Sequence, residues 1–244
     1  MHSRLVAILA AVFLVHACAS DRLPPSPPQP APTPVPQASQ RSDPDSDAFA
    51  HRIARIVGRL ATAAEGLENK DGRIPGAGMR IKVELYRDDA VAAMCDRNNV
   101  YVSSGMVRFA KSDDELAFLI GHEIAHQLLD HIPATGIVDH IYVRNPAQSA
   151  VRFPAEHQTE YEADFLGAYL AARAGFEVAG CSQFYTRLAG WPARRQTAAV
   201  EAGAKKRVLA CDRAAAEIKQ AGDRNQALVP NMQRLDEALS SRAR

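Results

Sequence analysis

The 244-residue sequence has no strong excess of charge: 29 lysines and arginines stand against 28 aspartates and glutamates, which gives a formal net charge of +1. It also lacks a run of basic residues interleaved with aromatic ones, the pattern typical of nucleic-acid-binding proteins. After Val15, no segment is apolar enough to cross a membrane. We therefore expect no nucleic-acid partner and no transmembrane helix in the mature chain.

The N-terminus has the organisation of a bacterial export signal. A short basic start is followed by an apolar run from Leu5 to Val15, which is too short to span a bilayer and is typical of a signal peptide. Residues 15–18 read Val-His-Ala-Cys and resemble the lipobox of bacterial lipoproteins, although His16 departs from the usual small or apolar residue. Cys18 would then carry the lipid, and Ala19 favours the outer membrane. The alternative is an ordinary signal peptide cut nearby.

Proline dominates the segment that follows. Nearly every second residue from Pro24 to Pro36 is proline, and this composition favours an extended polyproline-II spacer that buries no core. The sequence thus predicts three parts: a signal peptide with a lipobox at 1–18, a proline-rich disordered linker at 19–47, and one globular domain at 48–244 with a helical C-terminal part. We expect a periplasmic protein of the bacterial envelope, anchored by lipid to the outer membrane.

Cysteine is scarce, with four residues in the whole chain. Cys95, Cys181 and Cys211 lack the spacing of a cysteine metal site, so we predict structural roles for them. An exported chain meets an oxidising compartment, in which a disulfide is expected. Cys181 and Cys211 are the favoured pair because both lie in the C-terminal third, but the pairing among the three stays open.

Hydrophobic periodicity predicts an α+β domain that is mostly helical, with a small antiparallel or mixed sheet before the first motif-bearing helix. Ser112 and Glu115 form a capping-box pattern at the start of that helix. The predicted elements are a helix at 49–67, strands at 80–86, 91–95 and 100–103, helices at 113–131 and 155–174, the latter ended by Gly175, and a helix at 198–219; residues 134–153 are predicted to be a long loop.

Residues 122–126 read H-E-x-x-H within the predicted helix 113–131. Residues four apart lie on the same face of a helix, so His122 and His126 can point ring nitrogens at one ion. Zinc prefers nitrogen ligands in tetrahedral geometry, and a catalytic zinc keeps one position open for water. Glu123 is then placed to act as general base toward that water. On a solvated helix, the same letters also occur without any metal.

The third ligand must come from elsewhere. The pattern H-E-x-x-H-x-x-G-x-x-H is excluded because positions 129 and 132 are leucine and isoleucine. The alternative is a glutamate from a separate helix, and Glu160 is our choice over Glu162, which points elsewhere on that helix. Asp164 lies four residues after Glu160 and is predicted to accept the second ring N–H of a ligand histidine. Gly167, on the same face, allows two helices to approach closely.

The segment H-E-x-x-H followed by Glu160-Tyr161-Glu162-Ala163-Asp164 resembles the gluzincin metallopeptidase family that contains HtpX and the CAAX prenyl proteases, in its soluble, lipoprotein-like bacterial branch. The resemblance covers roughly residues 80–175 and implies a zincin-like fold, one Zn²⁺ per chain, ligands His122, His126 and Glu160, and Glu123 as the base. It also implies an edge strand along which the substrate backbone lies, formed by Asn98, Asn99, Val100, Tyr101, Val102 and Ser103.

One departure from the family concerns the stabilisation of the transition state. Many relatives have a His-Pro segment after the second helix, and here only Trp191-Pro192 is found. Arg187, Arg194 and Arg195 are the remaining candidates for that role.

His131 lies five residues after His126, so its side chain is rotated off the face of the helix that holds the two ligand histidines. We predict that His131 is a solvent-exposed group or a cation at the helix C-terminus.

The sequence thus predicts a zinc endopeptidase that acts on unfolded or damaged exported proteins, in a quality-control role implied by the resemblance. The alternative is a chaperone-like lipoprotein that holds client chains on the same scaffold without cutting them. Metal content does not separate the two hypotheses, since an inactive relative can keep its ligands.

Overall fold

The computed structural model describes residues 44–65, 67, 74, 80–132, 136, 138–143, 158–190, 198–224, 227–233 and 235. All of them belong to the unit formed by residues 32–244. The predicted signal peptide, Cys18 and most of the predicted linker lie outside the described residues. Within the described part of the chain, no helix is long and apolar enough to cross a membrane.

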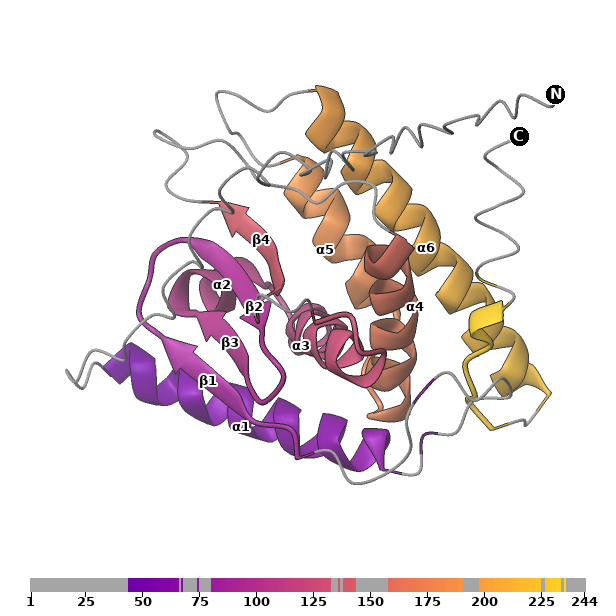
Figure 1. The fold of residues 1–244 in the computed structure, drawn as a ribbon, viewed down its shortest axis with the longest axis horizontal. Coiled ribbons are helices and arrows are strands. Elements are labelled where there is room, and N and C mark those ends of the chain that lie inside the picture. Colours follow the sequence, from indigo (N-terminus) through magenta and orange to yellow (C-terminus); the bar gives the residue numbers. More distant parts are fainter. Residues whose placement is uncertain are drawn as a thin grey trace, which may run out of the picture. The chain divides into compact units, whose positions relative to one another are not determined.

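The described elements confirm an α+β fold that is mostly helical, with a small mixed sheet ahead of the motif-bearing helix (Figure 1). In chain order they are α1 (Pro44–Ala64), β1 (Val83–Tyr86), β2 (Val91–Cys95), β3 (Val100–Ser103), α2 (Ser104–Phe109), α3 (Asp113–Leu128), β4 (Val138–Val143), α4 (Gln158–Arg173), α5 (Ala179–Ala189) and α6 (Ala198–Asp223).

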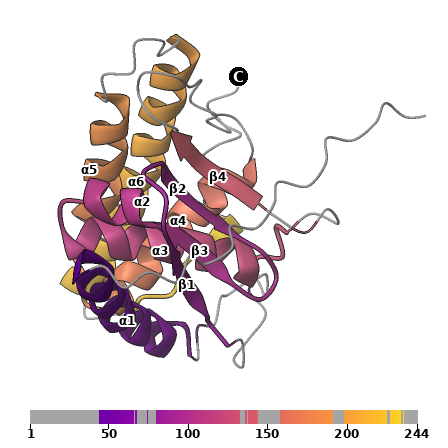
Figure 2. The same cartoon turned by 90° about the vertical axis from the view of Figure 1, so that its left-hand side faces the viewer.

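The strands form a four-stranded sheet in the order β1-β3-β2-β4. β3 pairs in parallel with β1 and antiparallel with β2, so it is an inner strand, and the prediction that it forms an edge was wrong. β4 pairs antiparallel with β2 and stands at one edge of the sheet (Figure 2). The predicted loop at 134–153 was therefore wrong in part. β4 was not predicted because its own sequence has no strand pattern, and it forms by pairing with β2 through a register that is irregular at Ala93 and Met94.

Helix α3 begins where the capping pattern predicts. The Ser112 hydroxyl accepts a hydrogen bond from the Glu115 backbone N–H at 3.2 Å. The Glu115 carboxylate accepts from the Lys111 backbone N–H at 2.9 Å, rather than from Ser112. The helix lies between the sheet and the α4–α6 helices (Figure 1), which explains why nearly all its residues from Glu115 onward are buried.

Helices α3 and α4 cross at two glycines, as predicted for Gly167. A Cβ atom added at Gly167 would lie 2.7 Å from the His122 backbone nitrogen and 2.9 Å from its Cα. A Cβ added at Gly121 would lie 3.0 Å from the Gly167 carbonyl oxygen. The absence of side chains therefore brings the backbone of His122 against α4.

Replacing Gly167 with alanine is expected to lower the free energy of unfolding by about 1–3 kcal/mol, because the added methyl group overpacks a rigid backbone contact. Gly58→Ala is the matched control: Gly58 is also helical, and nothing lies within 4 Å of a Cβ added there. The control should gain stability, by up to about 1 kcal/mol. Denaturant unfolding measures both changes, and a Gly167→Ala variant as stable as the parent chain would contradict the packing argument.

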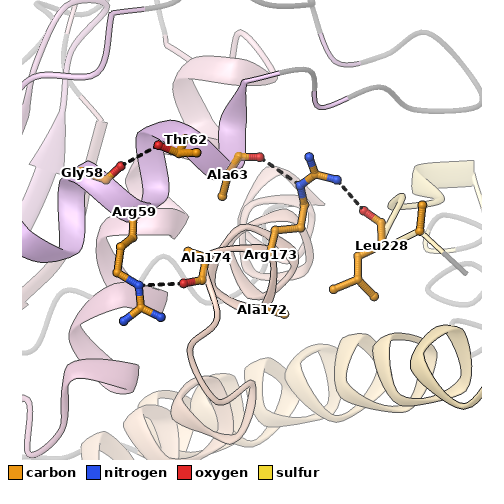
Figure 3. Close-up of a pocket in the computed structure, with 9 residues that line it drawn as sticks. Gly58, Arg59, Thr62, Ala63, Ala172, Arg173, Ala174 and Leu228 are labelled. Carbon is orange, nitrogen blue, oxygen red and sulfur yellow. Dashed lines mark hydrogen bonds between the residues drawn. The ribbon is translucent and has the colours of Figure 1, made fainter. Parts of the chain in front are cut away.

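Two arginines brace α1 against α4 around a shallow pocket (Figure 3). Arg59 Nε donates to the Ala174 carbonyl at 2.8 Å, and Arg173 Nε donates to the Ala63 carbonyl at 2.9 Å. These carbonyls lie at helix C-terminal ends, where intrahelical donors run out. Each helix thus supplies a cation to the end of the other, and this fixes the position of α4.

A disulfide joins Cys181 on α5 to Cys211 on α6, which confirms the favoured pairing. Cys95 is free and buried in β2. The predicted helix at 198–219 is present as α6, and the helix predicted at 155–174 is present as α4, with Gly175 at φ +76° just beyond it. The short helix α2 was not predicted, although the Ser103 hydroxyl caps it by accepting from the Met106 N–H.

Candidate metal centre

The side chains of His122, His126 and Glu160 converge on one point between α3 and α4. The two Nε2 atoms are 3.1 Å apart, and the Glu160 carboxylate oxygens lie 3.7 Å from His122 Nε2 and 3.6 Å from His126 Nε2. All three residues are buried. The juxtaposition predicted from the two motifs is therefore present.

The donor set and its spacing fit zinc. Two ligands at about 2.0–2.1 Å from a tetrahedral ion lie about 3.3–3.4 Å from each other. The three separations at this centre bracket that value. Two imidazole nitrogens and one carboxylate are a known ligand set of catalytic zinc, which leaves a fourth position for water. The centre therefore requires only small side-chain adjustments to hold the ion.

Glu123 follows His122 on α3 and is fully buried. It lies against the thiol of Cys95 on β2. Burial first, and then the negative charge of Glu123, raise the pKa of the Cys95 thiol far above its usual value. Cys95 consequently stays a neutral neighbour of Glu123, in agreement with a structural role.

Asp164 lies where the sequence places it, beside the first ligand histidine. His122 Nδ1 and Asp164 Oδ1 are 2.9 Å apart, and both side chains are fully buried. A carboxylate at Nδ1 holds the proton there and leaves Nε2 free to bind a metal. Glu160 and Asp164 lie four residues apart on one face of α4. That face therefore supplies both a candidate ligand, Glu160, and the residue that orients His122, Asp164.

The second ligand histidine also has an orienting partner, and it is His131. His131 Nδ1 lies 3.1 Å from His126 Nδ1, and His131 Nε2 lies 3.0 Å from Glu162 Oε2. The prediction of a solvent group was wrong, because the side chain is only 8% exposed. The chain leaves the helical path after Leu128, with Asp130 at φ 55°, and this turn brings His131 back over His126. Glu162 points away from the metal centre, as predicted.

Arg207 and Tyr185 also belong to the centre, and neither was predicted from the sequence. Arg207 Nη1 donates to Glu160 Oε2 at 2.7 Å, and Arg207 Nη2 donates to Asp164 Oδ1 at 2.7 Å. Tyr185 donates its hydroxyl to the same Asp164 oxygen at 2.7 Å. A signal for Arg207 existed: it lies on the apolar stripe of α6 with Ala204, Cys211 and Ala214, where a solvent-facing cation is not expected.

Electrostatics keep this arginine charged. Burial lowers the pKa of the Arg207 guanidinium, but the negative charges of Asp164 and Glu160 outweigh burial and raise that pKa well above its usual value. Burial raises the pKa of Tyr185, while Arg207 opposes the shift, so the phenol stays protonated. The cluster thus contains a permanent cation and a permanent hydroxyl donor.

Of the arginines predicted to stabilise the transition state, the structure describes Arg187. Arg187 forms an ion pair with Glu115, seven residues before His122 on α3, so it is committed to the start of that helix. Arg194, Arg195 and the Trp191-Pro192 segment lie outside the described residues.

The predicted substrate-binding residues are occupied within the domain. Asn98 and Asn99 form the β2–β3 turn, where their backbone N–H groups donate to Asp96 Oδ1. The inner strand buries the others: Val100 and Val102 lie in the core, Tyr101 donates its hydroxyl to Asp96, and Ser103 caps α2. The error arose because a short apolar strand does not reveal from its own sequence which strands will flank it.

Comparison with known proteins agrees with this geometry. Residues 47–143 match the model of peptidase family M48. The mitochondrial metalloendopeptidase OMA1 of Arabidopsis thaliana is 27% identical over 128 residues, which cover 46% of this chain and 26% of the relative. The protein of the same name from Saccharomyces cerevisiae is 23% identical over 176 residues, covering 64% of this chain and 50% of the relative.

The chain therefore spans at most half the length of these curated relatives. The family match includes H-E-x-x-H but ends before Glu160, which the structure brings to the same point. The chain is therefore similar to peptidase family M48 over residues 47–143, and the cluster of His122, His126 and Glu160 also draws on α4, beyond the matched segment.

Proposed function

We propose that this chain is a zinc-dependent endopeptidase. The observation that carries the proposal is the convergence of His122, His126 and Glu160 in a buried cluster, with Glu123 next to the first ligand. Each ligand histidine has a partner at Nδ1, so both rings are held with Nε2 toward the same point. A random H-E-x-x-H on a solvated helix would have neither the third ligand nor these partners.

His122, His126 and Glu160 would hold the ion, leaving one position open. Zinc, when bound, supplies a Lewis acid that polarises the scissile carbonyl and makes water more acidic. Glu123 takes the proton from the attacking water and passes it to the leaving amine, as a general base and then a general acid. Burial of Glu123 keeps bulk water from competing for this proton.

We propose that the substrate is an extended polypeptide lying along β4. This strand pairs with β2 on one side, and no described strand pairs with its other side. Val138 of β4 is paired with Cys95, whose thiol lies against Glu123, so this edge of the sheet adjoins the general base. Strand addition at a free edge binds main chain rather than a particular sequence, which suits unfolded clients.

The proposed setting is the bacterial envelope, with the domain anchored to the outer membrane through a lipid on Cys18. The support is the lipobox-like segment at 15–18 and the proline-rich stretch that follows it. In this setting, the substrates would be unfolded or damaged exported proteins, and the activity would serve protein quality control.

Incubation of the purified chain with an unfolded protein such as casein tests the proposal. We expect cleavage fragments with the zinc-loaded protein, none after treatment with a chelator, and recovery when zinc is returned. A zinc-loaded chain that prevents aggregation of an unfolded client, yet releases it intact, would favour the chaperone-like alternative and contradict proteolysis.

A further inference from the structure

Arg207 is the largest fully buried side chain among the described residues, and its charge faces the metal centre. Its guanidinium contacts two carboxylates with different tasks: Glu160, a ligand, and Asp164, the partner of His122. The contact with Asp164 uses both Nε and Nη2, which is the two-pronged geometry available to arginine and not to lysine. One side chain from α6 therefore fixes two residues of α4.

The formal charges explain why a cation is needed there. Glu123, Glu160 and Asp164 place three negative charges in a buried region, and Arg207 offsets one of them. Buried polar and charged groups are tolerated only when they are paired and hydrogen-bonded, so Arg207 is the partner that satisfies and orients Glu160 and Asp164.

The Cys181–Cys211 disulfide lies one helical turn from the Arg207–Tyr185 contact on both α5 and α6. Cys211 follows Arg207 by four residues on α6, and Tyr185 follows Cys181 by four residues on α5. Cys181 is bonded to Cys211, and the guanidinium carbon of Arg207 lies 4.8 Å from the centre of the Tyr185 ring. The disulfide and the Arg207–Tyr185 contact are consecutive layers of the α5–α6 interface, so the covalent bond limits the movement of Arg207 relative to α5.

We propose that Arg207 is a positioning residue for the metal centre, and that the Cys181–Cys211 disulfide holds α6 in the place from which Arg207 aligns Glu160 and Asp164. This inference rests on the metal site of the proposed function. It gives α6 a role in metal affinity, although no described side chain of α6 is among the converging ligands.

The first experiment measures zinc affinity by competition with a chromophoric chelator, beside thermal unfolding of the metal-free chain. Arg207→Gln is expected to weaken zinc binding about 10- to 100-fold, the range found for residues that orient metal ligands. Arg207→Lys should recover only part of the loss, because it keeps the charge without the two-pronged contact. Arg187→Gln is the matched control: it removes another arginine paired with a buried carboxylate, and zinc affinity should stay within about threefold.

A merely structural role for Arg207 predicts a different pattern. Arg207→Gln and Arg187→Gln would then both lower the unfolding temperature of the metal-free chain and leave zinc affinity unchanged, and this result would overturn the proposal. A parent chain that binds no zinc would instead contradict the metal site itself, so the two failures are distinguishable.

The second experiment is a double-mutant cycle with Cys181→Ser/Cys211→Ser, measured at a temperature where every variant is folded. If the disulfide acts through Arg207, its removal weakens zinc binding in the parent chain and adds little in the Arg207→Gln background. Equal losses in both backgrounds, or no loss in the parent chain, would contradict the link between disulfide and metal centre.

Discussion

Glu123→Gln is expected to reduce peptide cleavage by about 10²- to 10⁴-fold, the usual contribution of a general acid–base residue. The amide has nearly the size of the carboxylate, so the buried surroundings of Glu123 on α3 need not change. It cannot accept a proton from the attacking water, and this step is lost. The rate of cleavage of labelled casein measures the effect.

Zinc affinity serves as the control for this variant, because Glu123 is not among the converging ligand atoms. The Glu123→Gln protein should bind zinc within a few-fold of the parent chain, whereas His126→Ala should lose both the metal and cleavage. Proteolysis that persists in Glu123→Gln would remove the general base from the mechanism.

Glu160→Gln is expected to weaken zinc binding by more than about 100-fold, because residues that only orient ligands already contribute 10- to 100-fold. Glu162→Gln is a close control, since Glu162 is also buried and lies two residues along the same helix. Its carboxylate meets His131 rather than the metal centre, so we expect a loss of about tenfold or less.

Chelator competition on the two purified variants gives both numbers, and cleavage of casein should fall in the same order. The assignment of Glu160 depends on the ranking and not on either value alone. A larger loss in Glu162→Gln than in Glu160→Gln would transfer the ligand role to the other glutamate.

The local elements of the site were predictable from the sequence. Ser112 is the N-cap residue that predicts the start of α3, and the spacing of four residues places His122 and His126 on one face of that helix. The same spacing on α4 joins Glu160 to Asp164. These predictions succeeded because the helical repeat fixes side-chain directions within a single element, whatever surrounds that element.

The errors concern relations between elements that are distant along the chain. β3 lies inside the sheet because β1 pairs with it on the side opposite β2. β4 forms because it pairs with the side of β2 opposite β3. His131 was predicted to be a solvent group or a cation at the helix C-terminus, but a turn after α3 brings it back between His126 and Glu162. In each case the outcome depends on a partner that the segment's own sequence does not contain.

Arg207 is the clearest example of the difference between features set within one helix and features set by contacts between helices. From the sequence alone we predicted three ligands, a base and the partner of one ligand, because each motif lies within one rigid helix. Only the tertiary structure decided that a cation from α6, 47 residues after Glu160, would complete the centre. The physical reason is that a buried charge selects its partner by proximity in the folded core, and that proximity is set by the packing of α4, α5 and α6 together.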